Sequence, residues 1–129
     1  MKFQPDQLAG TNAVTRIEPG RLWVGTQPWT TSVLVPWQGD VHEWAAGSAA
    51  DLTEAHFARI VALAPAVVIF GSGARIRFPA PALIRPLIEA RIGVETMDTG
   101  AAARTYNVLA AEGRTVVGAF ILEGSTASL

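Results

Sequence analysis

The sequence predicts a single α/β domain with a mixed β-sheet, in which an antiparallel β meander precedes an α-β-α-β-α-β succession. Three observations support this fold class. The chain has 129 residues, half of them hydrophobic, which suits one domain with its own core. Short apolar segments separated by turn residues fill the first third of the chain. From residue 51 onward, amphipathic segments alternate with apolar runs, which indicates parallel strands joined by helical crossovers.

The predicted meander comprises the segments 14–18, 21–24, 32–35 and 41–44. Pro19-Gly20 separates the first two and is a turn signal, so these segments are expected to form a hairpin. All the tryptophans fall in this region, and most are expected in or beside the core. Trp29 and Trp37 lie next to prolines at expected loops, which makes either one a candidate for a partner surface.

Three helices are predicted over 51–64, 81–91 and 98–111. Asp51 and Glu54 have the spacing of a capping box, so the first helix is expected to begin there. Pro86 would shorten or kink the second helix, and Gly93 is read as its stop signal. Gly113 is expected to cap the third helix.

Strands are predicted at 66–70, 94–97 and 115–122, with a short extended piece at 75–78. The run at 66–70 is continuously apolar and partly β-branched, which is typical of a strand that is buried on both faces. The predicted domain organisation is an N-terminal arm at 1–13, a folded core at 14–122 and a polar tail at 123–129.

Composition excludes several classes of protein. The absence of cysteine excludes disulfides and thiolate chemistry. His42 and His56 lie in different segments, so no metal site and no cofactor is predicted. The net charge of −1 argues against nucleic-acid binding, which needs a basic surface.

No run approaches the roughly 20 apolar residues of a membrane span and no signal peptide is recognisable, so a cytoplasmic protein is expected. The apolar composition also allows a homodimer.

Two small polar loops follow two of the predicted strands, Gly71-Ser72-Gly73 and Asp98-Thr99-Gly100. In open parallel sheets, ligands bind beyond the carboxyl ends of the strands, close to helix N-termini. Arginines follow both loops, and guanidinium groups bind anions, so an anion pocket is expected. The candidate ligand- or partner-binding residues are Gly71, Ser72, Gly73, Arg75, Arg77, Asp98, Thr99, Arg104, Thr105 and Asn107.

Structural roles for the same residues stay open. The glycines can serve only to turn the chain, and Ser72 can bond to its own backbone. Asp98 has the position of a helix N-cap. Arg104 can fold back over Asp98 as an ion pair, which would fix the loop without any ligand.

Motifs for catalysis are incomplete. Phe70-Gly71-Ser72-Gly73-Ala74 does not match the G-x-S-x-G nucleophile elbow, and the loop lacks the dinucleotide fingerprint. A triad of Ser72, His56 and Asp98 is conceivable from residue types alone, but His56 is expected to be a solvated helix residue. The sequence therefore leans against an enzyme.

Several segments together resemble a domain-of-unknown-function family that includes the mitochondrial NADH dehydrogenase (complex I) assembly factor three. The segments are 32–36, 67–73, 75–79, 93–99 and 104–114, and the resemblance covers roughly 14–122. It implies a compact α/β fold with a mixed central sheet, no established reaction for bacterial members, and action through protein partners such as respiratory-complex subunits. Where many relatives have cysteine, this chain has Ala103, so it has no thiol mechanism there.

Two hypotheses result. The first is a bacterial-type protein-binding or assembly-factor-like module related to complex I assembly. The alternative is a small-molecule or anion-binding enzyme or sensor that uses a pocket at 71–73 and 98–100.

Overall fold

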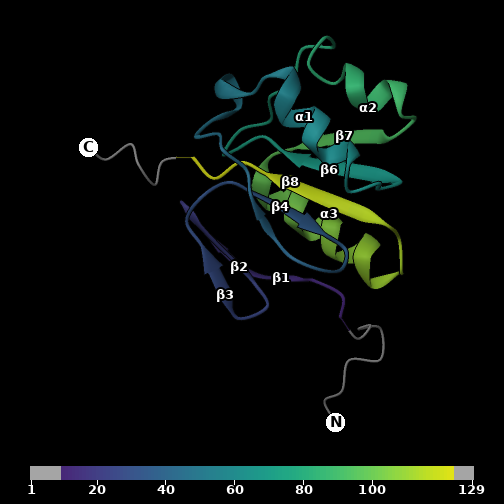
Figure 1. Ribbon diagram of the computed structural model, residues 1–129. Coiled ribbons are helices and arrows are strands. Elements are labelled where there is room, and N and C mark those ends of the chain that lie inside the picture. The colour runs from purple at the N-terminus through teal and green to yellow at the C-terminus, as the bar shows by residue number, and fades with distance from the viewer. Residues whose placement is uncertain (1–9, 124–129) are drawn as a thin grey trace.

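A five-stranded mixed sheet lies at the centre of the computed structural model, which describes residues 10–123 (Figure 1). The first nine residues of the expected arm and residues 124–129 of the expected tail lie outside the described residues. The strands are β1 Val14–Glu18, β2 Arg21–Val24, β3 Gln27–Trp29, β4 Val33–Pro36, β5 His42–Glu43, β6 Val67–Gly71, β7 Gly93–Met97 and β8 Val116–Phe120. The helices are α1 Glu54–Val61, α2 Arg85–Glu89 and α3 Thr99–Ala111, preceded by a short 3₁₀ helix at Ala49–Asp51.

The strand order of the central sheet is β5-β4-β8-β6-β7. Strand β6 pairs in parallel with both β7 and β8, whereas β4 is antiparallel to β8 and β5. The predicted mixed sheet and its parallel half are therefore confirmed.

The predicted meander is divided between two sheets. Strands β1, β2 and β3 form a separate antiparallel sheet, while β4 and β5 join the central one. The physical reason is burial. Every residue of β4 is buried, so this strand needs cover on both faces, whereas β1 has three exposed residues and suits a sheet with one solvated face.

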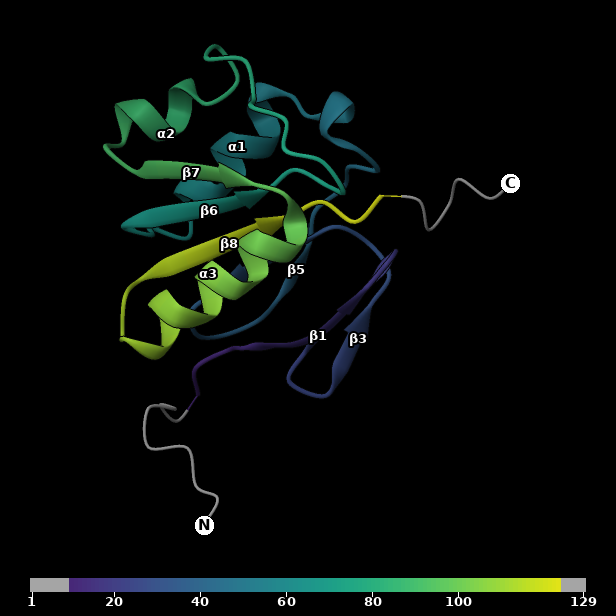
Figure 2. The same cartoon turned by 180° about the vertical axis from the view of Figure 1, so that it is seen from behind.

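The central sheet separates two hydrophobic cores. Helices α1 and α2 cover one face, and α3 covers the other together with the three-stranded sheet (Figures 1 and 2). Alternate residues of β4, β6 and β8 supply the two cores. Val33 and Ile69 pack on the α3 side, and Leu34 and Phe70 pack on the α1 side.

Helix α1 begins later than the capping pattern at Asp51 predicts. Asp51 ends the 3₁₀ helix, and its carboxylate accepts from the Gly47 N–H at 3.2 Å. Leu52 is extended, with ψ 142°, so the chain leaves helical geometry before Thr53 takes the N-cap position. The His56 ring nitrogen Nδ1 accepts from the Thr53 N–H at 3.0 Å.

Helix α2 is shorter than predicted, because residues 81–84 form turns. Pro86 lies in the first turn of α2, where its missing N–H costs nothing, so it begins the helix instead of kinking it. Arg91, at φ 61°, takes the left-handed position after the helix, and Gly93 is the first residue of β7. The extended piece predicted at 75–78 pairs with no strand.

Helix α3 matches its prediction and joins the two sheets. Asp98 is its N-cap and accepts from the Ala101 N–H at 2.9 Å, and Gly113 turns the chain after it at φ 84°. Asn107 donates from Nδ2 to the Val14 carbonyl and accepts from the Val14 N–H, both at 2.8 Å. The Tyr106 hydroxyl donates to the Pro36 carbonyl at 2.8 Å.

Candidate functional site

The loops after β6 and β7 lie side by side at one edge of the central sheet, as the parallel topology predicts. The Ser72 N–H donates to the Met97 carbonyl at 2.9 Å, and the Thr99 N–H donates to the Gly73 carbonyl at 2.8 Å. The Gly73 N–H donates in return to Thr99 Oγ1 at 2.8 Å. The two loops therefore form one hydrogen-bonded unit.

Thr99 connects this unit to the end of β8. Its side chain is buried, with 5% exposed, and its hydroxyl donates to the Ile121 carbonyl at 2.8 Å. Gly71 lets α3 approach β6 closely, because a Cβ at this position would lie 2.9 Å from Thr99 Cα. Three segments that are distant in the chain meet at one threonine hydroxyl.

Ser72 is fully buried and has a structural role. Its hydroxyl donates to the Arg75 carbonyl at 2.7 Å and accepts from the Arg77 N–H at 2.8 Å. The conceivable triad with His56 is not assembled, because the His56 ring binds Thr53 and the Ala45 carbonyl instead. Ser72 shapes the loop that follows it.

The ion pair between Asp98 and Arg104 that the sequence left open is absent from the described residues, where Arg16 and Glu18 form an ion pair. Asp98 Oδ1 and an Arg104 guanidinium nitrogen lie on the same side of Gly100, 3.5 and 3.7 Å from a Cβ built there. The N-cap role that the sequence left open for Asp98 is the role that it has.

A cavity of about 520 Å³ opens beside the two loops, between them and the β1–β2 turn. Among the candidate residues, Gly73, Asp98 and Thr99 line it, and the three arginines do not. Its charged lining consists of carboxylates, and its lining includes Ile17, Glu18, Pro19, Asp98, Leu122 and Glu123. Carboxylates repel anions, so the expectation of an arginine-lined anion pocket is wrong for this cavity.

Thr105 and Asn107 also bind within the protein. The Thr105 hydroxyl contacts Met97 Sδ at 3.3 Å, and both ends of the Asn107 amide bind Val14. The polar Arg-Thr-Tyr-Asn run that stands out in α3 is thus largely explained by contacts that hold the two sheets to this helix.

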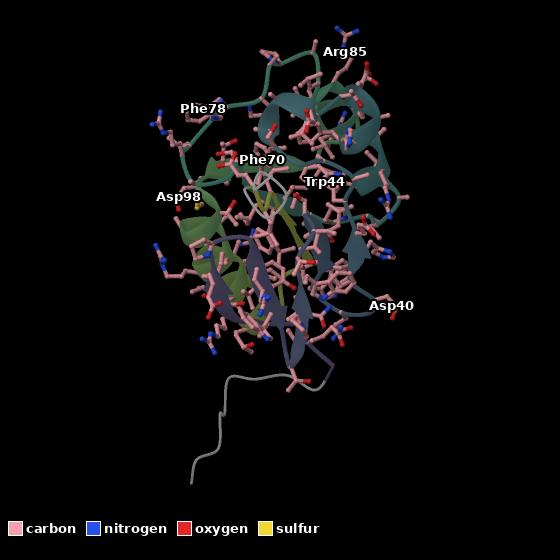
Figure 3. The ribbon with its side chains drawn as sticks, turned by 90° about the vertical axis from the view of Figure 1, so that its left-hand side faces the viewer. Asp40, Trp44, Phe70, Phe78, Arg85 and Asp98 are labelled. Atoms are coloured by element: carbon pink, nitrogen blue, oxygen red, sulfur yellow. The ribbon has the colours of Figure 1, made fainter. Side chains whose placement is uncertain are left out.

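Arg75 and Arg77 lie on an exposed loop, with Ile76 and Phe78 as their apolar neighbours. Phe78 is 75% exposed and Ile76 is 51% exposed. Figure 3 shows Phe78 at the periphery, whereas Phe70 lies in the interior. The sequence pattern predicts an extended piece at 75–78 but does not predict that these two apolar side chains are exposed. The available signal was Pro79 and Pro81, which oppose strand pairing and so leave alternate residues uncovered.

No helix among residues 10–123 is long and apolar enough to cross a membrane. The same residues contain no group of three or more metal-ligating side chains.

Curated relatives of the chain are mammalian. The chain is 37% identical over 84 residues to NADH dehydrogenase [ubiquinone] 1 alpha subcomplex assembly factor 3 of Bos taurus, covering 64% of this chain and 45% of the relative. It is 33% identical over 100 residues to the same factor of Mus musculus, covering 76% of this chain and 52% of the relative. The chain thus spans about half the length of these relatives.

Solved bacterial structures share the fold. A crystal structure of a Bordetella parapertussis protein has a TM-score of 0.84 and 37% identity, and the match covers 89% of this chain and 98% of that one. A solution structure from Bordetella pertussis, described as a Mth938-like domain, has a TM-score of 0.83 and 32% identity, covering 96% and 94% of the two chains. The family model described as "Protein of unknown function (DUF498/DUF598)" matches residues 14–121. The chain therefore belongs to the DUF498/DUF598 family.

Proposed function

We propose that this chain is a cytoplasmic protein-binding module that assists the assembly of a respiratory NADH dehydrogenase complex. The observation that carries the proposal is the exposed loop at 74–80. Phe78 and Ile76 expose most or half of their apolar side chains there, at 75% and 51%. Exposed aromatic side chains anchor protein interfaces, and these two residues lie two positions apart on one loop.

The hydrogen bonds that the polar candidate residues form support a protein-binding role. The side chains of Ser72, Thr99 and Asn107 form hydrogen bonds with backbone atoms of the fold. The anion-binding alternative has less support, because the charged residues that line the cavity beside the two loops are carboxylates. The curated relatives are named as assembly factors, and the proposal carries that role to this chain.

Deletion of the gene from its native host tests the proposal. We expect less assembled NADH dehydrogenase complex on native gels and lower NADH:quinone oxidoreductase activity in membranes, both restored by the wild-type gene. Unchanged assembly and activity in the deletion strain would contradict an assembly role. A host in which the complex is essential requires depletion in place of deletion.

Affinity purification provides the second measurement. The tagged full-length chain, expressed at native abundance, is expected to enrich subunits of the complex over an unrelated tagged protein. Enrichment of no protein above this control would argue against protein binding altogether.

A further inference from the structure

A groove lies next to the exposed loop at 74–80, which is called the Phe78 loop below. It has a volume of about 480 Å³, within the range of roughly 300–1,000 Å³ that is typical of ligand pockets. Most of its lining residues have apolar side chains, although polar atoms supply almost as much of the lining surface; the apolar residues include Ala49, Leu52, Phe70, Phe78, Pro79 and Leu83. Arg77 adds a charged group to the same lining.

The Phe78 loop is held in shape from within. The buried Ser72 hydroxyl binds the Arg75 carbonyl at 2.7 Å and the Arg77 N–H at 2.8 Å, and prolines at 79 and 81 restrict the backbone that follows. A surface that is ordered before binding loses less conformational entropy on binding. The loop therefore presents Ile76 and Phe78 on a preorganised binding surface.

The segment between β6 and β7 is strongly basic, although the chain as a whole has a net charge of −1. It carries four arginines against one glutamate, all exposed: Arg75, Arg77, Arg85, Glu89 and Arg91. None of these arginines forms an ion pair within residues 10–123. Arg85 lies at the outer end of the molecule beyond the Phe78 loop (Figure 3). Arg77 lines the groove and Arg75 lies two residues before it, so exposed arginines that form no ion pair within residues 10–123 border the apolar surface.

We propose that the Phe78 loop and its groove bind an acidic segment of a partner protein. The segment places an apolar side chain in the groove against Phe78, and its carboxylates pair with Arg75 and Arg77. This inference rests on the proposed protein-binding function and adds the chemistry of the partner. Planar guanidinium groups bind carboxylates with two parallel hydrogen bonds, and opposite charges accelerate association and set specificity.

Two other occupants fit the surface less well. A second copy of this chain in a two-fold interface would place the same basic loop on both sides of the interface, and like charges across an interface cost affinity. An anionic lipid surface would pair with the arginines, but it would leave a groove of side-chain size unfilled. Charge and shape together favour an acidic protein segment.

Selection from a display library of short random peptides on the immobilised full-length chain tests the proposal. We expect the enriched peptides to combine an aromatic or aliphatic residue with a net negative charge. Phe78→Ala and Arg77→Glu should each lower the affinity for the enriched peptides by at least about tenfold. Matched controls are Val108→Ala and Arg114→Glu, which alter an exposed apolar residue and an exposed arginine on α3 and the turn after it, and they should leave affinity unchanged. Circular dichroism establishes that all four variants are folded.

Several outcomes would overturn the proposal. These are no enrichment, enrichment without acidic bias, or equal binding by the Phe78→Ala variant and the Val108→Ala control. Sedimentation equilibrium that finds a dimer abolished by Phe78→Ala would assign the surface to a second copy. Co-sedimentation with phosphatidylserine vesicles that is lost in Arg77→Glu would assign it to a membrane.

The deletion strain separates this inference from the proposed function. If Phe78→Ala and Arg77→Glu fail to restore complex assembly while both controls restore it, the inference is supported. If all four variants restore assembly as well as wild type does, the assembly role stands and the docking site is wrong. If the deletion has no effect on assembly, the assembly role fails, and the peptide selection alone decides the site.

Discussion

Asn107 binds both the N–H and the carbonyl of Val14 at 2.8 Å. A side-chain amide that satisfies two backbone groups in this way acts like an additional strand residue at the edge of β1. Because Asn107 lies on α3, these two bonds fasten the three-stranded sheet to the helix that covers the central sheet.

Asn107→Ala is expected to lower the free energy of unfolding by about 1–3 kcal/mol, because two part-buried backbone groups lose their partner. Urea denaturation measures the loss. Val108→Ala serves as the control and should stay within about 0.5 kcal/mol of wild type, since Val108 is exposed. Equal stability of the two variants would show that Val14 finds another partner.

Gly73 tests the geometry of the hydrogen-bonded loops. At φ 116° it occupies a region that L residues rarely adopt, and a Cβ there would lie 2.6 Å from the Glu123 carboxyl group. Gly73→Ala is expected to cost more than about 1 kcal/mol, measured as a lower unfolding midpoint. Gly47→Ala is the matched control, because its Cβ would meet only Asp51 at 3.5 Å. Addition of Glu123→Ala should recover the part of the loss that comes from steric overlap.

At the scale of elements, α1 is attached at three points to β5 and the chain that follows it. Arg59 donates to the Glu43 carbonyl at 2.7 Å, the Trp44 indole N–H donates to the His56 carbonyl at 3.1 Å, and His56 Nε2 lies 2.8 Å from the Ala45 carbonyl. The Nδ1 atom of His56 accepts a hydrogen bond from the Thr53 N–H, so Nε2 carries the ring N–H and donates a hydrogen bond to the Ala45 carbonyl.

His56→Ala should destabilise the protein by about 0.5–2 kcal/mol, the usual cost of losing a helix cap. His56→Gln is the informative comparison, because glutamine at this position completes a capping box and is expected to recover part of the loss. The measurement is thermal unfolding followed at far-ultraviolet wavelengths. If alanine and glutamine variants unfold at the same temperature, the cap contributes nothing.

Local patterns predicted most elements but not their limits. The start of α3 followed from Asp98 and its end from Gly113, because each residue satisfies backbone groups within its own turn. The start of α1 was misplaced because Asp51 and Thr53 are both acceptable caps. Packing of Leu52, which is buried, decides between them, and packing is not visible in a local pattern.

The partners of the candidate site were predictable only in part. The adjacency of the two loops followed from parallel strands. The bond from Thr99 to the Ile121 carbonyl could not be predicted, because it joins a side chain to a backbone atom whose position depends on the whole sheet. The exposure of Phe78 depends in the same way on where α2 and the 3₁₀ helix lie.

At the scale of the whole molecule, Tyr106 joins α3 to the central sheet: it is fully buried on α3, and its hydroxyl donates to the Pro36 carbonyl at the end of β4. Burial raises the pKa of Tyr106 above its ordinary value, because the tyrosinate anion would lose its hydration. The folded state therefore holds this proton more tightly than the unfolded chain does.

The stability of the protein should consequently fall at alkaline pH. The contribution of the neutral tyrosine is complete below about pH 10, where an unfolded tyrosine ionises, and it is lost progressively as the pH rises above that value. Urea denaturation across this range is the measurement. In Tyr106→Phe the alkaline loss should be smaller, and because Tyr106 is the only tyrosine, tyrosinate absorbance reports its ionisation directly. A wild-type profile identical to that of the variant would contradict the assignment.

The position of β8 has a consequence for synthesis. This strand lies between β4 and β6, so the part of the sheet made last by the ribosome is the one that joins its two halves. Nascent chains stalled before residue 116 should remain sensitive to protease, and resistance should appear in a single step once β8 has left the exit tunnel. Such a domain acquires its fold only after nearly all of it has been translated. Until then the apolar strands β4 and β6, which pair with β8, are accessible to chaperones.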